Sequence, residues 1–124
     1  MPEPVDAEDI VGGDLLWRRI DRNMVAREIG GTWSIQSWAY KDQHHELSVY
    51  LGRETTEANV LAAGKPNQIV IVVAAGIIRD LGYKIVRDPE PDDRSHCLVF
   101  PYPRKKADRQ AMAAASTPLK DPTI

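Results

Sequence analysis

Residues 79–103 have the sequence RDLGYKIVRDPEPDDRSHCLVFPYP. Two segments within this stretch, Tyr83–Arg87 and Ser95–Phe100, are rich in the apolar and β-branched residues that favour strands. The acidic turn between them contains two prolines, which have no backbone N–H to donate to a sheet, so it separates the strands. The second strand places His96 and Cys97 side by side, which makes it the first candidate for a functional site.

The remaining segments predict further strands and helices. Glu46–Leu51 alternates between polar and apolar residues, as a half-buried strand does, whereas Gln68–Val73 is apolar on both faces, as an interior strand is. Ala74–Leu81 has apolar residues at helical spacing, and Gly82 supplies a stop. The order predicts an α+β fold, a single small domain with a mostly antiparallel sheet of five or six strands and two or three short helices. Further strands are expected at Asp14–Ile20 and Thr32–Tyr40, and further helices from Thr55 or Thr56 to Ala63 and at Arg104–Ala115.

Composition divides the chain into three parts. Residues 1–13 hold four acids, no base, two prolines and two glycines, so a disordered acidic arm is expected there. Residues 14–103 form the expected α+β domain. Residues 104–124 are expected to form a short C-terminal helix and a flexible tail, because the last dozen residues are rich in Ala, Ser, Thr and Pro.

Composition also limits the class of protein. The chain has 124 residues and a net charge of −2, which argues against attraction of the whole surface to nucleic acid or to an anionic membrane. Cys97 is the one cysteine, so no internal disulfide can form and a reducing compartment is indicated. No apolar run approaches the roughly 20 residues of a membrane span, and no signal-peptide pattern opens the sequence. We expect a cytoplasmic protein without membrane contact.

The histidines and the cysteine raise the question of a metal site. His44, His45, Glu46, His96 and Cys97 could together supply ligands for zinc. Their spacing matches no zinc pattern, because adjacent residues on a strand point to opposite faces. The alternative is a solvated pair of histidines in a turn and a small core cysteine. We expect no metal and no cofactor.

Arginines early in the chain suggest a binding site for anions. The planar guanidinium groups of Arg18, Arg19 and Arg79 match a phosphate or a carboxylate. Together with His96 on a late strand, such arginines fit a nucleotide pocket, in which one of them would hold phosphate and His96 would lie near the reaction centre. The alternative is that these arginines pair with nearby acids or face water.

Aromatic and basic clusters suggest two kinds of contact surface. Trp33, Trp38 and Tyr40 lie in an aromatic-rich half of the chain, and such residues are enriched at protein interfaces, although they also fill cores. A second cluster near the C-terminus could bind nucleic acid or form a solvated helix face. It consists of Arg104, Lys105, Lys106 and Arg109.

Several segments resemble sequences seen elsewhere. The region from Leu16 to Phe100 resembles a loose group of small, uncharacterised bacterial proteins, and this resemblance implies a small bacterial domain but no particular activity. The segments that carry it are LWRRI, SWAYKD, ELSVYL, IIRDLGYKIVRDPEP and SHCLV.

A fainter similarity is to compact ADP-ribosyltransferase-like folds, which open with an arginine on a first strand and place Ser and Glu on later strands. The resemblance implies Arg18 or Arg19, Ser37 or Ser48, and Glu46 for those positions.

Three functions follow as hypotheses. The first is a non-enzymatic protein that binds a partner protein in an accessory, antitoxin-like or immunity-like role, because no nucleophile motif is present. The second is a small nucleotide- or NAD-handling enzyme that uses Arg18, Arg19, Glu46 and His96. The third is nucleic-acid binding through the basic segment near the C-terminus, which the net charge makes the weakest of the three.

Overall fold

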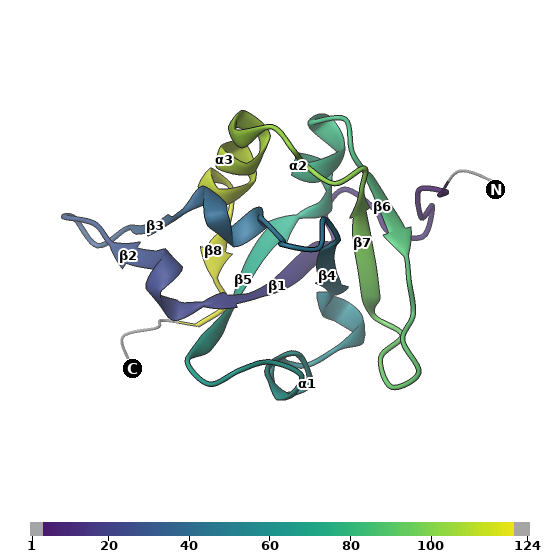
Figure 1. Cartoon of the computed structure of the whole chain (residues 1–124), viewed down its shortest axis with the longest axis horizontal. Helices are drawn as coiled ribbons and strands as arrows, with labels where there is room; N and C mark the ends of the chain where they lie inside the picture. Colours follow the sequence, from purple (N-terminus) through teal and green to yellow (C-terminus); the bar gives the residue numbers. More distant parts are fainter. Residues whose placement is uncertain (1–3, 121–124) are drawn as a thin grey trace.

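The computed structural model describes residues 4–120. A six-stranded antiparallel sheet has the strand order β6-β7-β4-β1-β5-β8, and a two-stranded hairpin, β2-β3, projects from it (Figure 1). Three helices complete the domain, so the α+β fold with a mostly antiparallel sheet is confirmed. The strands are Leu15–Asp21 (β1), Val25–Arg27 (β2), Trp33–Ile35 (β3), Leu47–Leu51 (β4), Gln68–Ala74 (β5), Lys84–Arg87 (β6), His96–Phe100 (β7) and Thr117–Pro118 (β8). The α-helices are Glu57–Ala62 (α1), Ala75–Asp80 (α2) and Lys106–Ala114 (α3), and the 3-10 helices are Arg22–Met24 (η1), Ser37–Tyr40 (η2) and Gly52–Glu54 (η3).

The pairing of β1 is uneven. All seven of its residues pair with β5, from Leu15 opposite Ala74 to Asp21 opposite Gln68. On its other side β1 pairs with β4 at two positions, which include Leu16 opposite Leu51. The second half of β1 therefore has a sheet neighbour on one side and a gap on the other.

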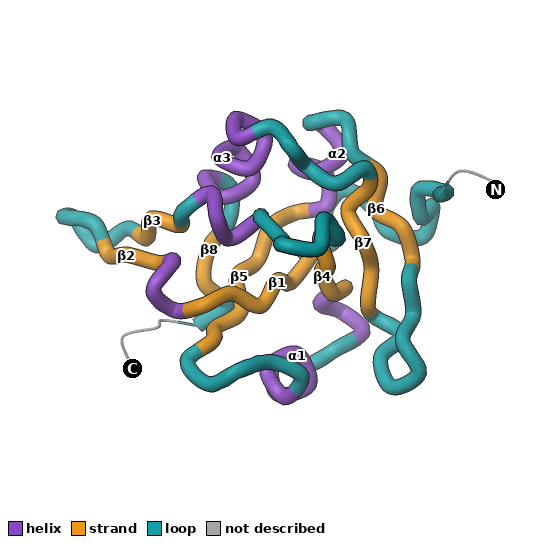
Figure 2. Tube along the Cα trace, viewed as in Figure 1, coloured by secondary structure: helices purple, strands orange, loops and turns teal. Residues whose placement is uncertain are grey.

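The two faces of the sheet are covered differently. Figure 2 shows α2 and α3 on one side of the sheet and α1 on the other. The first side carries the main core, in which alternate strand residues pack against Ile78 of α2, Met112 of α3 and Tyr40 of η2. The second side has a smaller cluster around Tyr50 and Val60. Polar side chains therefore have room on the second side.

The segment before β1 is folded onto the sheet. The sequence predicts a disordered arm at residues 1–13, whereas residues 4–13 lie against β6 and α2, and residues 1–3 lie outside the described residues. Ala7 and Ile10 are buried, and the backbone N–H of Ala7 donates to the carbonyl of Ile85. The Arg79 guanidinium, a candidate anion ligand, instead pairs with Asp6 and donates to backbone carbonyls of the same segment. Two buried apolar side chains and the half-buried guanidinium of Arg79 hold this acidic segment against the sheet.

Arg87 joins this segment to the sheet. Its guanidinium on β6 pairs with Asp9 of the N-terminal segment and, at 2.6 Å, with Glu54 of η3. Arg87 holds the pKa of both carboxyl groups below their ordinary values through these hydrogen bonds. Because the folded pKa values are lowered, the stabilisation is present above the ordinary carboxyl pKa and is lost as the pH falls through the lowered values.

Local turn chemistry changes two expected segments. The strand expected at Thr32–Tyr40 divides into β3 and the 3-10 helix η2, and the loop before it contributes β2. Gly30 and Gly31 have φ angles of 102° and 90°, which favour glycine and close the β2-β3 hairpin. Of the expected tail, Thr117–Pro118 pairs with β5 as β8, and residues 121–124 lie outside the described residues.

Replacement of Ile10 tests whether the N-terminal segment is part of the core. Ile10 is 1% exposed, so Ile10→Ala should lower the free energy of unfolding by about 2–5 kcal/mol through lost burial and a new cavity. Val11→Ala is the matched control, since Val11 is 60% exposed and its loss should change little. Chemical denaturation measures both, and equal midpoints for Ile10→Ala and the wild type would mean that the segment is mobile in solution.

Candidate functional site

A cleft of about 390 Å³ lies where β1 parts from β4. It is lined from β1, from η2 and the loop after it, from β4 and from the turn before β5. Six charged side chains contribute, namely Arg18, Arg19, Lys41, Lys65, Asp21 and Asp42. Four cations against two carboxylates give the lining a formal charge of +2, in a chain whose net charge is −2.

Arg18 fills the gap in the sheet. Its guanidinium donates to three backbone carbonyls, those of Ala39, Ser48 at 2.8 Å and Lys41 at 3.4 Å. These bonds join β1 to β4 and to η2 where the backbone ladder has stopped. Burial lowers the pKa of Arg18, opposed by nearby Tyr40, yet a guanidinium stays charged at neutral pH. The half-buried guanidinium has carbonyl partners and no carboxylate within 4 Å among residues 4–120.

Arg19 lies on the opposite side of β1. Its Nη1 atom donates to the carbonyl of Val60 in α1 at 2.7 Å. The side chain crosses Gly64, where an added Cβ would lie 2.3 Å from Cδ of Arg19, so a larger residue at that position would displace the arginine. Across residues 4–120, the carbonyl of Val60 is the one hydrogen-bond partner of Arg19, which leaves most of its fork open.

The two carboxylates in the lining are engaged by neutral donors. Asp42 accepts from the backbone N–H of His44 at 2.8 Å, and Asp21 accepts from the side chain of Gln68 at 3.1 Å. Within the described part of the chain, none of the four lining cations forms an ion pair with a carboxylate. The positive charge of the cleft is therefore not neutralised by direct contacts.

Ser48 connects the cleft to His96. Ser48 lines the cleft, and its Oγ lies 2.9 Å from Nε2 of His96. The other ring nitrogen, Nδ1, lies 2.8 Å from the carbonyl oxygen of Asp88 and 3.2 Å from its carboxylate. Glu90 places a carboxylate oxygen 3.4 Å from Nε2, and the Tyr50 ring packs edge-on against the imidazole at 5.4 Å. His96 is thus fixed on every side and is 5% exposed.

The strand register explains this meeting. Ser48 on β4 lies opposite Leu98 on β7, and Tyr50 lies opposite His96. Ser48 and His96 are therefore diagonal neighbours on one face of an antiparallel pair, close enough for a long side chain to bridge. Asp88 lies just after β6, and its backbone N–H donates to the carbonyl of His96. Nothing local in the sequence encodes this pairing.

Of the residues expected in an enzyme site, three lie in or next to the cleft and one lies outside it. Arg18, Arg19 and Ser48 line the cleft, and the His96 ring contacts the hydroxyl of Ser48. Ser48 is one of the two serines that the ADP-ribosyltransferase resemblance implies. Glu46 is exposed in the turn before β4 and does not line the cleft, and its backbone N–H donates to the Asp42 carboxylate.

The aromatic residues expected at a partner surface also divide. Tyr40 is fully buried and its hydroxyl bonds to Ser116, so the prediction that Tyr40 lies at a contact surface is wrong. The 3-10 turn of η2 directs it inward. Burial raises the pKa of Tyr40 to about 12. Trp38 is 62% exposed and lines the cleft, and Trp33 is half-buried, with the Arg27 guanidinium 5.7 Å from its ring.

The basic segment begins α3. Arg104, Lys105 and Lys106 are exposed, and the guanidinium of Arg104 lies over the Tyr102 ring. Arg109 is half-buried and donates to the carbonyl of Pro103 at 2.9 Å. Three of the four cations therefore face solvent, while the fourth serves to close the turn before the helix.

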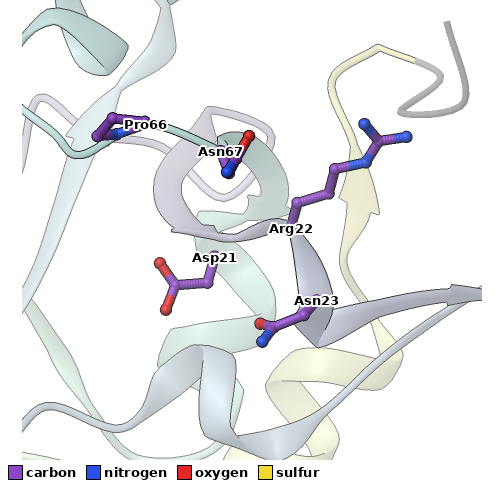
Figure 3. A pocket seen from close by; sticks show the side chains of 5 residues that line it. All are labelled: Asp21, Arg22, Asn23, Pro66 and Asn67. Carbon is purple, nitrogen blue, oxygen red and sulfur yellow. The ribbon is translucent and has the colours of Figure 1, made fainter.

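A second hollow, of about 520 Å³, lies between the end of β1 and the turn before β5 (Figure 3). It is lined by Asp21, Arg22, Asn23, Pro66 and Asn67. In Figure 3 the Arg22 side chain extends away from Asp21. These residues include no nucleophile and no histidine, so the cleft beside Ser48 is the better candidate site.

Residues 4–120 contain no group of three or more His, Cys, Asp or Glu residues that could hold a metal ion. None of the helices in the same range has the length and apolar character needed to cross a membrane. Comparisons of the chain with protein-family models, with curated proteins and with solved structures found no match.

Cys97 should be chemically inert in the folded protein. It is fully buried on the face of β7 opposite His96, and burial raises the pKa of its thiol to about 11. At pH 8 roughly one molecule in a thousand would carry the reactive thiolate. A disulfide reagent such as dithionitrobenzoate should therefore label native protein far more slowly than protein unfolded in guanidinium. Equal rates would contradict the burial of this thiol.

Proposed function

We propose that the cleft between β1 and β4 binds a phosphorylated nucleoside. The observation that carries the proposal is the gathering of four cations, without ion-pair partners among residues 4–120, around a cleft of about 390 Å³. Unpaired cations in a concave site attract an anionic ligand, and cavities of roughly 300–1,000 Å³ accept small molecules.

The cations have different chemical roles in this proposal. Arg19 has most of its guanidinium free, and a planar fork suits two oxygens of one phosphate. Lys41 and Lys65 are exposed and supply point charges. Arg18 is held by three carbonyls and adds a fixed charge behind the ligand.

The nucleoside part of the proposal is supported by Trp38. Its indole is 62% exposed and lines the same cleft as the cations. Stacking of a base on an aromatic ring stabilises binding by about 1–3 kcal/mol and tolerates any base. An aromatic surface beside a cluster of cations favours a ligand that contains both a base and a phosphate.

A thermal-shift titration tests this function. ADP should raise the melting temperature by several degrees, because a ligand at 100 times its dissociation constant adds about 2.7 kcal/mol. The double variant Lys41→Gln/Lys65→Gln should lose most of the shift, whereas Lys106→Gln, an exposed cation outside the cleft, should keep it. Trp38→Ala should weaken the binding of ADP more than the binding of pyrophosphate, because pyrophosphate has no base to stack on the indole.

The control ligand is adenosine, which lacks phosphate and should give little shift. The proposal fails if ADP, AMP and pyrophosphate all leave the melting temperature unchanged. It fails equally if the lysine double variant responds to ADP as the wild type does.

A second candidate, binding of a partner protein, is supported by the β2-β3 hairpin. This hairpin projects from the domain (Figure 1), and Ile29 near its tip is completely exposed. Trp33 on β3 of the same hairpin is half-buried, and Trp38 follows in η2. An exposed isoleucine on a projecting element, together with tryptophan, has the composition of an interface anchor.

Substitution of the hairpin tip tests the second candidate. A purified partner captured by the wild type should bind Ile29→Ser at least tenfold more weakly, with unchanged thermal stability, because this side chain makes no packing contribution to the fold. Val11→Ser is the matched control, an exposed apolar residue at another surface. Equal affinities for Ile29→Ser and the wild type would place the contact elsewhere.

A further inference from the structure

We propose that Ser48 is a catalytic nucleophile activated by His96, and that the site transfers the phosphoryl group of the ligand in the basic cleft. The inference rests on the proposed nucleotide binding for its substrate class, and on separate contacts for its chemistry. Those contacts are the two hydrogen bonds of the His96 ring and the position of Ser48 in the cleft lining.

The first step of the argument is the pair Ser48 and His96. Their distance of 2.9 Å between Oγ and Nε2 is that of a hydrogen bond between a nucleophile and its general base. When Nδ1 carries the ring proton and donates to Asp88, Nε2 is the acceptor and the serine hydroxyl is the donor. The carbonyl of Asp88, 2.8 Å from Nδ1, favours this tautomer because a carbonyl can only accept.

The second step is the environment of the imidazole after it takes a proton. The Asp88 carboxylate lies 3.2 Å from Nδ1 and the Glu90 carboxylate 3.4 Å from Nε2. Both carboxylates would stabilise the imidazolium that proton transfer creates. The ring is 5% exposed and packs against Tyr50, so its orientation is set before a substrate binds.

The third step is the charge beside the nucleophile. The Arg18 guanidinium donates to the backbone carbonyl oxygen of Ser48 at 2.8 Å, so one cation is held in direct contact with the residue that carries the nucleophile. Arg19, Lys41 and Lys65 line the same cleft. Phosphoryl transfer depends mainly on positioning and on cations that stabilise charge on the phosphoryl oxygens, and four cations line this cleft.

The reaction balances with water as the co-substrate. The Ser48 oxygen forms a bond to phosphorus as the bond to the leaving oxygen breaks, and the serine proton passes to Nε2 of His96. His96 returns that proton to the leaving oxygen. Water then attacks the phosphoserine, gives a proton to His96, and releases inorganic phosphate as Ser48 regains its hydroxyl proton.

An alkyl fluorophosphonate is the probe that tests the nucleophile. Attack by Ser48 forms an oxygen–phosphorus bond, breaks the phosphorus–fluorine bond and releases fluoride, while the proton goes to His96. Intact mass spectrometry of the full chain should show one adduct, and peptide mapping should place it on Ser48. Ser48→Ala should give no adduct, and His96→Ala should slow labelling by about 100-fold or more.

Control variants separate chemistry from folding. Ser34→Ala removes a half-buried serine outside the cleft and should label as the wild type does. Asp88 is a positioning residue, so Asp88→Ala should slow labelling and Asp88→Glu should restore part of the rate. Each variant is first compared with the wild type by thermal melting; if His96→Ala unfolds, His96→Gln takes its place.

The outcomes distinguish this inference from the binding proposal. Labelling of Ser48 together with release of phosphate from ADP supports the inference. An ADP thermal shift in a protein whose Ser48 is never labelled would overturn the nucleophile and leave binding intact. Labelling of Ser48 without any nucleotide shift would support the serine and overturn the nucleotide. An adduct that persists in Ser48→Ala would overturn the assignment to this residue.

Discussion

The guanidinium of Arg18 closes a break in the sheet, and the rest of the candidate site depends on it. β1 pairs along its whole length with β5 but at two positions with β4, which leaves carbonyls at the parting edge without backbone donors. Arg18 donates to the carbonyls of Ala39, Ser48 and Lys41 in their place. A buried carbonyl without a donor costs about 1–3 kcal/mol, so this side chain replaces part of the ladder. It also brings a charge into the cleft.

The two faces of the sheet carry different kinds of side chain. The main core lies under α2, α3 and η2, and it includes Cys97 of β7. His96, the preceding residue, points to the other face, where the smaller cluster leaves room for polar side chains. The alternation of a strand therefore separates an inert thiol from a fixed imidazole one residue away. Arg19 extends toward α1 on that second face, whereas Arg18 extends toward η2, which carries Trp38, so the cleft at the parting of β1 and β4 has cations from both faces of the sheet.

Sequence patterns anticipated the elements whose signal is local. The alternation in residues 46–51, the apolar run in residues 68–73 and the helix stop at Gly82 each reflect neighbours along the chain, and the structure contains β4, β5 and α2 there. Composition does not report burial. Residues 4–13 are acidic, yet Ile10 is buried and Arg79 holds the segment. Tyr40 looked like an interface aromatic, but the 3-10 turn of η2 turned it into the core.

By itself the sequence determined the α+β class, because local periodicity is a property of the chain alone. It also identified Arg18, Arg19 and His96 as candidate site residues, because their side-chain types can bind anions or transfer protons. The tertiary structure decided which of these meet. Ser48 and His96 are 48 residues apart in sequence and 2.9 Å apart in space, while Glu46, two residues from Ser48, faces solvent. Strand register sets such contacts, and register follows from the packing of the whole core, since a shift of one residue would turn every side chain to the other face.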